Sequence, residues 1–147
     1  MDDIYYMKIA LQEARIAFEN GEVPIGAVLV DEDGFIIAKT HNLVETFGDP
    51  TAHAEILAIR QASKIFGLRL TNCSLYVTME PCPMCAGALV LARVRRLIYA
   101  VPSPCGAAES LFNVTNNPNL NHQIEVTAGC LEQEAKSILK DFFIHKR

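Results

Sequence analysis

Two short motifs constrain the fold most, because both contain residues that bind metal ions. The first is Thr51-Ala52-His53-Ala54-Glu55, and the second is Glu80-Pro81-Cys82-Pro83-Met84-Cys85. Each motif is predicted to stand at the start of a helix, where free backbone amides and the helix dipole favour thiolate over thiol. The fold must therefore bring two helix N-termini together, so that an imidazole can meet two sulfurs.

The residue types in these motifs predict a catalytic zinc site. His53, Cys82 and Cys85 are three ligands, and two thiolates with one imidazole favour zinc over other divalent ions. Three protein ligands leave one tetrahedral position open, where the metal can activate water. Glu55 lies in the same helical turn as His53 and is predicted to transfer protons. The spacing His-x-Glu followed by Pro-Cys-x-x-Cys is the signature of zinc-dependent nucleobase deaminases.

Two other interpretations of the motifs stay open. A Cys-x-x-Cys pair in a chain without an export signal could be a redox pair or part of the core, although its combination with His-x-Glu argues against both. Alternatively, Cys105 or His41 could supply a fourth ligand and close a structural zinc site. A closed site would leave Glu55 without a purpose.

Composition excludes several classes of protein. The chain has 147 residues, 50% of them hydrophobic, which suits a single deaminase domain over residues 1–147. No apolar stretch approaches the roughly 18 residues of a membrane span, and no secretory signal is evident, so a cytoplasmic protein is expected. Five cysteines in such a chain do not indicate a disulfide framework. The net charge of −4 argues against broad, charge-driven binding of nucleic acid but does not exclude a compact RNA site.

Hydrophobic periodicity predicts helices that alternate with strands. The expected helices are 3–19, 52–65, 83–92 and 131–143, and the expected strands are 23–30, 35–38, 74–78, 94–101 and 123–127. Residues 31–34 are typical of a hairpin turn, and Asp49-Pro50-Thr51 of a helix start. This order predicts a three-layer α/β/α domain with helices on both faces of the sheet.

With these motifs the chain resembles the cytidine deaminase-like superfamily, and more closely the bacterial tRNA adenosine deaminases, which convert the wobble adenosine of an anticodon to inosine. The likeness covers nearly the whole chain and includes residues 21–28, 41–42, 49–55, 75–82, 84–87, 121–122 and 141–143. It implies a central five-stranded mixed sheet, one Zn2+ per subunit and a tRNA anticodon stem-loop as substrate. It also implies a homodimer whose substrate groove uses both subunits.

The resemblance assigns contacts with the target nucleoside to three positions. Asn42 would contact the nucleoside, at its sugar. Ile25 and the backbone around Ala54 would shape the base pocket and read the base.

The resemblance assigns RNA contacts to the C-terminal segment as well. Phe142 and Phe143, with Lys146 and Arg147 following, would meet loop nucleotides that are flipped out of the stack, as aromatic side chains do in single-stranded RNA recognition. The alternative for either phenylalanine is that it packs the last helix against the sheet.

Residues 101–110 depart from the family pattern. The family usually has an acidic residue and a lysine before a Gly-rich segment in this loop, which lies against the RNA. Here the segment Val-Pro-Ser-Pro-Cys-Gly-Ala-Ala-Glu-Ser is one residue shorter and has neither charge, and Glu109 stands where a glycine is usual. The zinc chemistry is expected to survive this change, whereas the substrate stays open.

Three functions are therefore compatible with the sequence. The first is adenosine-to-inosine editing of a tRNA anticodon loop, which the motif at 49–55 and the C-terminal segment favour. The second is deamination of a free base or nucleoside such as guanine or cytosine. The third is a non-catalytic zinc-containing binding protein, against which the intact ligands and Glu55 argue.

Overall fold

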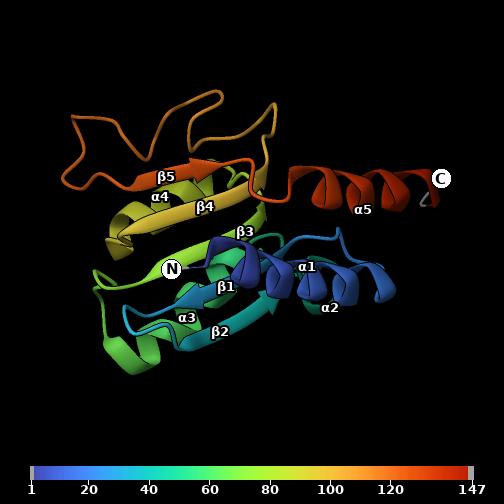
Figure 1. The fold of residues 1–147 in the computed structure, drawn as a ribbon, viewed down its shortest axis with the longest axis horizontal. Coiled ribbons are helices and arrows are strands. Elements are labelled where there is room, and N and C mark those ends of the chain that lie inside the picture. Colours follow the sequence, from blue (N-terminus) through green and yellow to red (C-terminus); the bar gives the residue numbers. More distant parts are fainter. Residues whose placement is uncertain (1, 146–147) are drawn as a thin grey trace.

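The computed structural model describes residues 2–145 and confirms a mixed sheet between two layers of helices (Figure 1). The helices are α1 (Asp3–Glu19), α2 (Val44–Phe47), α3 (Ala54–Phe66), α4 (Pro83–Ala92) and α5 (Glu132–His145). The strands are β1 (Gly26–Val30), β2 (Ile36–His41), β3 (Ser74–Met79), β4 (Arg96–Val101) and β5 (Glu125–Ala128). Their order in the sheet is β2-β1-β3-β4-β5, which confirms the expected five strands.

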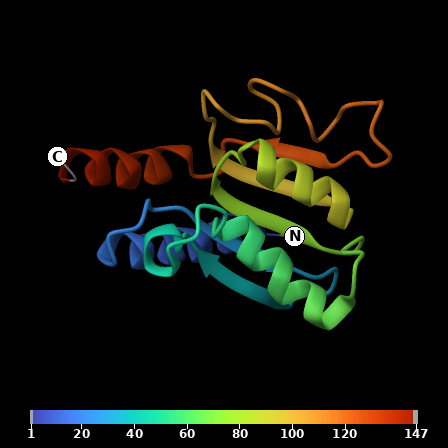
Figure 2. The ribbon, with the colours of Figure 1, turned by 180° about the vertical axis from the view of Figure 1, so that it is seen from behind.

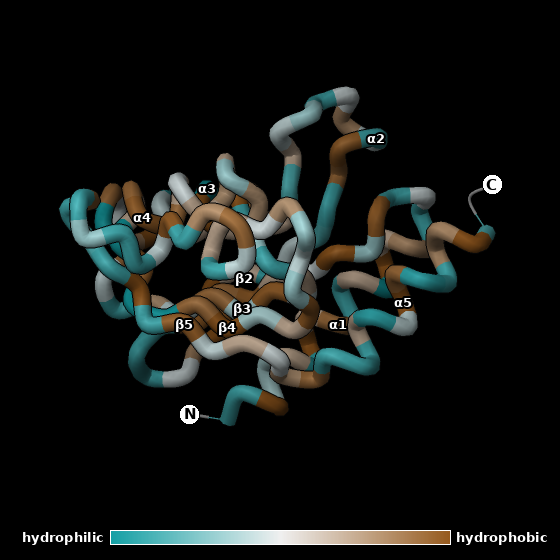
Figure 3. Tube along the Cα trace, turned by 90° about the horizontal axis from the view of Figure 1, so that it is seen from above, coloured by the Kyte–Doolittle hydropathy of each residue, from teal (hydrophilic) through white to brown (hydrophobic). Residues whose placement is uncertain are grey.

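The two faces of the sheet bury alternate side chains of each strand. In β1, Ala27 and Leu29 belong to the core under α3 and α4, whereas Val28 and Val30 belong to the core under α1 and α5. Figure 2 shows α3 and α4 side by side over one face, and Figure 3 shows α1 and α5 on the other. Within the described residues, no helix is long and apolar enough to cross a membrane.

Strand direction brings the two motifs to the same end of the sheet. Strand β1 is antiparallel to both β2 and β3, and β4 is parallel to β3, so β2, β3 and β4 all point the same way. The carboxyl end of β2 leads through α2 to the start of α3, and the carboxyl end of β3 leads directly to α4. The starts of α3 and α4 therefore meet at one edge, which is where ligands bind in open α/β sheets.

The first strand is pressed closely against the first helix at Gly26. A side chain there would overlap the backbone of Ala10 and Ala14 in α1. Glycine is therefore required for the approach of α1 to β1. The strand begins at Gly26 and not at residue 23, because the backbone N–H of Ile25 donates to the Val23 carbonyl at 2.8 Å and so forms a turn before the strand.

The helix expected at 52–65 begins two residues later than predicted. Asp49 accepts hydrogen bonds from the backbone amide and the hydroxyl of Thr51, at 2.8 and 2.7 Å, and so forms a turn of its own. Helix α3 instead has His53 at its N-cap position. Helix α2 is not among the predicted helices, because a single turn of four residues is too short to show helical periodicity.

Candidate metal centre and active site

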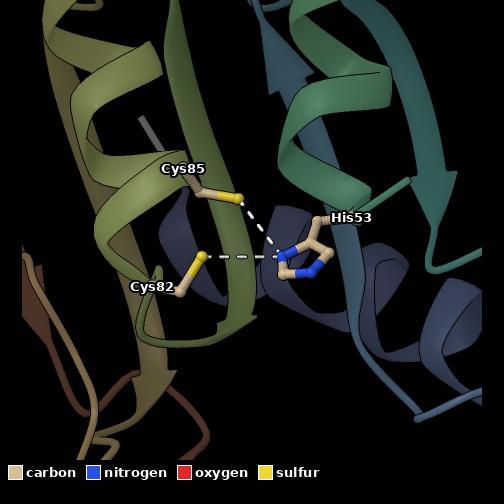
Figure 4. Close-up of side chains that lie close together, drawn as sticks. All are labelled: His53, Cys82 and Cys85. Atoms are coloured by element: carbon tan, nitrogen blue, oxygen red, sulfur yellow. Dashed lines mark hydrogen bonds between the residues drawn. The ribbon is translucent and has the colours of Figure 1, made fainter. Parts of the chain in front are cut away.

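His53, Cys82 and Cys85 converge across the gap between the two helix starts (Figure 4). His53 Nδ1 lies 3.6 Å from Cys82 Sγ and 3.5 Å from Cys85 Sγ, and all three atoms lie within 4.8 Å of one another. A tetrahedral zinc ion, with bonds of about 2.0 Å to nitrogen and about 2.3 Å to sulfur, sets its nitrogen and sulfur ligands about 3.5 Å apart. The spacing and the donor set therefore both fit zinc.

The helix starts explain why these side chains converge. His53 and Cys82 are the N-cap residues of α3 and α4. Cys85 is the third residue of α4, in the first turn that Pro83 begins. The hydrogen bond between the two thiols lowers the pKa of Cys82 and raises that of Cys85. Cys82 is therefore poised as a thiolate, which is the form that binds a metal.

A closed structural site is not supported by the geometry. Among the described residues, only His53, Cys82 and Cys85 form a group that could hold a metal. His41 Nδ1 instead faces the Glu13 carboxylate at 2.9 Å, and Cys105 is exposed outside the group. The three ligands leave a position for a reacting molecule, which is typical of catalytic zinc.

Glu55 is buried in the first turn of α3, beside the metal ligands. Only 4% of its surface is exposed, and burial raises the pKa of its carboxyl above the ordinary value. The charges of His53 and Cys82 also act on this pKa, which places the carboxyl near them. A raised pKa suits a group that must both accept and release a proton near neutral pH.

A cavity of about 600 Å³ opens on the His53 side of the metal ligands. Four of the five residues expected to bind substrate line it, namely Ile25, Asn42, Phe142 and Phe143. The remaining wall comes from His53 itself and from Gly21, Glu22, Val23, Val44, Glu45 and Pro50. The cavity is large enough for a nucleoside, and its size is typical of small-molecule sites.

Ala54 is fully buried and is not part of the cavity wall. Its backbone N–H donates to Asn42 Oδ1 at 3.0 Å, and its carbonyl accepts from Thr40 Oγ1 at 2.7 Å. These bonds fix the start of α3 to the end of β2. Base reading by the backbone around Ala54 stays a prediction.

The two phenylalanines near the C-terminus have different surroundings. Phe142 is only 6% exposed, and its ring lies 5.8 Å from that of Phe18 in an edge-to-face arrangement. Phe143 is 54% exposed. Phe142 therefore packs α5 against α1, and Phe143 presents its ring to solvent at the rim of the cavity. Lys146 and Arg147 lie outside the described residues.

Two comparisons of sequence identify the family. Residues 1–147 match the MafB19-like deaminase family. The tRNA-specific adenosine deaminase of Aquifex aeolicus (strain VF5) is 49% identical over 141 residues, which are 95% of this chain and 92% of that protein. The chain belongs to the tRNA-specific adenosine deaminase family.

Solved structures agree with this membership. A structure from a study of A-to-I editing by tRNA:A34 deaminases superimposes with a TM-score of 0.87 at 47% identity, and covers 92% of this chain and 99% of its own. Guanine deaminase from Bacillus subtilis has a TM-score of 0.66 at 40% identity and covers 85% of this chain and 83% of its own. This family member is therefore closer in structure to the tRNA:A34 deaminase than to that guanine deaminase.

Sequence reasoning missed two buried carboxylates that hold loops around the site. Glu22 accepts hydrogen bonds from the backbone amides of Glu45 and Thr46 at 3.0 and 2.7 Å, and so fixes α2 against the cavity. Glu80 is 4% exposed and binds the loop that follows β4. The available signal was a glutamate within a short apolar segment, as in Gly-Glu-Val-Pro and Met-Glu-Pro-Cys.

Proposed function

We propose that this protein deaminates adenosine to inosine at the wobble position of a tRNA anticodon loop, with zinc held by His53, Cys82 and Cys85. The reaction adds one water at C6 of adenine and releases ammonia. The observation that carries the proposal is the His53–Cys82–Cys85 group at zinc-ligand spacing beside the buried Glu55, in a chain of this family. A zinc ion bound there supplies Lewis-acid activation of the attacking water.

Glu55 is the group that moves protons in this proposal. Attack at C6 requires a proton to leave the water and another to reach ring N1, and the departing amine needs one more to leave as ammonia. A carboxyl that is buried beside the ligands and has a raised pKa can accept the first proton and pass it on. The Glu22 carboxylate, which lines the cavity, does not have this role in the proposal, because it is already bonded to α2.

The cavity residues would orient the nucleoside. Asn42 uses Oδ1 to hold Ala54, which leaves its amide nitrogen to donate to a sugar hydroxyl. Ile25 forms an apolar wall against the base, and the exposed ring of Phe143 offers a surface on which a neighbouring base can stack. Single-stranded loops present their bases in this accessible way.

We also propose a homodimer. Helix α4 is apolar on its outer side, where Leu91 is 82% exposed and Met84 37%. Leu111 and Phe112 are more than half exposed in the loop after β4. An interface between two subunits would bury apolar side chains of this kind.

The test is deamination by purified, zinc-loaded protein. The substrate is an anticodon stem-loop with adenosine at the wobble position, and a stem-loop with that adenosine moved by one nucleotide is the matched control. Free guanine, cytosine, adenosine and cytidine are assayed beside them. We expect inosine only in the first stem-loop, and no product from any substrate with Glu55→Ala.

Two outcomes would contradict the proposal. Ammonia release from free guanine without inosine in RNA would assign the protein to the small-molecule deaminases. Absence of any product from a protein with a full complement of zinc would support a binding protein. Light scattering of the same preparation measures the dimer, and a monomer at assay concentrations would overturn that part.

A further inference from the structure

The Glu80 carboxylate joins the two ends of the loop 102–110. At one end, Oε1 accepts the backbone N–H of Ser103 at 3.0 Å. At the other end, Oε2 accepts the backbone N–H groups of Glu109 and Ser110, both at 2.8 Å, and the Ser110 hydroxyl donates to Oε1 at 2.5 Å. One buried side chain therefore takes four hydrogen bonds from a single loop.

The same loop is tied to the segment that carries the cysteines. Glu80 stands two residues before Cys82, and the carbonyl of Pro81 between them accepts the backbone N–H of Ala107 at 2.9 Å. The backbone N–H of Glu80 donates to the Val101 carbonyl at 2.8 Å. Since β3 and β4 are parallel, both segments leave the sheet at the edge where the metal group lies. The loop therefore borders the cysteine side of the site.

Glu80 and Gly106 fill the same small space. A side chain at Gly106 would overlap the carboxyl group of Glu80, although the backbone there does not require glycine. The loop is thus closed tightly around the carboxylate, and its inner residues Gly106, Ala107 and Ala108 are buried. Its outer residues Pro102, Pro104 and Cys105 are exposed to an approaching molecule.

We propose that Glu80 is a positioning residue that fixes the 102–110 loop as the cysteine-side rim of the active site, and so determines affinity for polynucleotide substrates. This proposal rests on the proposed function, deamination of a tRNA anticodon loop. A single nucleoside fits inside the cavity, whereas an RNA loop is large enough to reach the rim as well. Glu80 is not among the residues that line the substrate cavity, so it would not touch the reacting atoms. Its loss should therefore affect binding of RNA and not the chemical step.

The geometry requires a carboxylate and not an amide. All four partners of Glu80 donate hydrogen bonds, and a carboxylate accepts at both oxygens. In Glu80→Gln one oxygen becomes an NH₂ group, which would face N–H donors and leave part of the loop without an acceptor. The substitution keeps the size of the side chain, so it releases the loop with little change in packing.

The experiment measures steady-state kinetics, zinc content and backbone amide NMR spectra of Glu80→Gln. We expect the KM for the stem-loop to rise at least tenfold, while kcat stays within threefold and zinc stays at one per chain. The backbone amide resonances of Ser103, Glu109 and Ser110 should shift, and their amide protons should exchange with solvent faster. Glu32→Gln is the matched control, because it removes the same charge from an exposed position in the turn between β1 and β2, at the opposite end of the sheet from the loop.

Two more variants keep the test decisive if Glu80→Gln folds poorly. Gly106→Ala displaces the carboxylate sterically and should reproduce the rise in KM, whereas Ser110→Ala removes one donor of four and should have a smaller effect. The positioning role would be overturned if Glu80→Gln shifted the amide resonances of the loop but left the KM for the stem-loop unchanged. A fall in kcat alone would also overturn it. If the wild-type protein does not deaminate the stem-loop, the proposed function fails. If the amide resonances of the 102–110 loop are unchanged in Glu80→Gln, Glu80 does not fix the loop, whatever the substrate is.

Discussion

Asn42 Oδ1 accepts the backbone N–H of Ala54 at 3.0 Å, and this bond joins the end of β2 to the helix that carries Glu55. Asn42 is only 5% exposed and also lines the cavity. One side chain therefore has two separable tasks. Its oxygen holds the start of α3, and its amide nitrogen is available to a substrate.

Two substitutions of Asn42 should separate these tasks. Asn42→Asp keeps an oxygen for the Ala54 amide but loses the NH₂ donor, so we expect a near-normal melting temperature and a fall in kcat/KM of at least tenfold. Asn42→Ala loses both and should also lower stability by about 1 kcal/mol, as loss of a helix cap does. Thermal unfolding and stem-loop deamination measure the two effects. Equal melting temperatures for both variants would show that the bond to Ala54 contributes nothing to folding.

Metal binding and proton transfer should respond to different substitutions. Glu55→Gln removes the proton carrier but none of the three ligands, so we expect zinc to remain and turnover to fall by about 100- to 10,000-fold. Cys85→Ser weakens the ligand set and should lose both zinc and activity. Elemental analysis measures the zinc content of the two purified variants, and inosine formation measures their turnover. Near-normal turnover by Glu55→Gln would exclude proton transfer by Glu55.

Glu22 gives a prediction about pH. Burial raises the pKa of its carboxyl, but hydrogen bonds from Thr46 and Glu45 outweigh burial and leave the pKa below the ordinary 4.5. A carboxyl with a depressed folded-state pKa stabilises the fold above its unfolded-state pKa, and this contribution is lost as pH falls through the folded-state value. We expect Glu22→Gln to cost about 1 to 3 kcal/mol at pH 7.

Urea unfolding of Glu22→Gln and the wild type at a series of pH values measures this linkage. The difference between the two proteins should be constant at neutral pH. It should shrink as the pH falls below the unfolded-state pKa of about 4.5 and through the lower folded-state pKa. Glu32→Gln, at an exposed position in the turn between β1 and β2, is the control and should show no such difference. A difference that keeps its full size down to the lowest pH at which the wild type still folds would mean that the charge of Glu22 does not stabilise the fold.

Most of the fold could be predicted because the residues that start and end helices locally do so at the same positions where the folded chain requires it. The bounds of α4 match the prediction of 83–92, since Pro83 starts the helix and the αL conformation of Arg93 ends it. The metal group was predictable for a similar reason, because both motifs begin helices at parallel strand ends. Helix α3 was placed two residues early because Asp49 caps a separate turn, which sequence pattern alone does not distinguish from a helix start.

The parts that could not be predicted depend on contacts between distant segments. The bonds of Glu22 to α2 and of Glu80 to Ser110 join residues more than twenty positions apart, and most of their donors are backbone amides, which every residue possesses. A pattern of residue types therefore cannot indicate which backbone amide a buried carboxylate will bind. The positions that bind these loops therefore became visible only in the folded chain.

The adjacent residues Phe142 and Phe143 give the last prediction, because their side chains point about 100° apart on the helix. Phe142 packs on Phe18 in the core, so Phe142→Ala should destabilise the fold by about 3 kcal/mol and impair every activity through stability. Phe143→Ala should leave the melting temperature within a few degrees and raise the KM for the stem-loop by about tenfold, since stacking on one base contributes about 1 to 3 kcal/mol. Calorimetry and stem-loop kinetics on both variants check this pair. If Phe143→Ala unfolds as readily as Phe142→Ala, its ring belongs to the core and does not bind RNA.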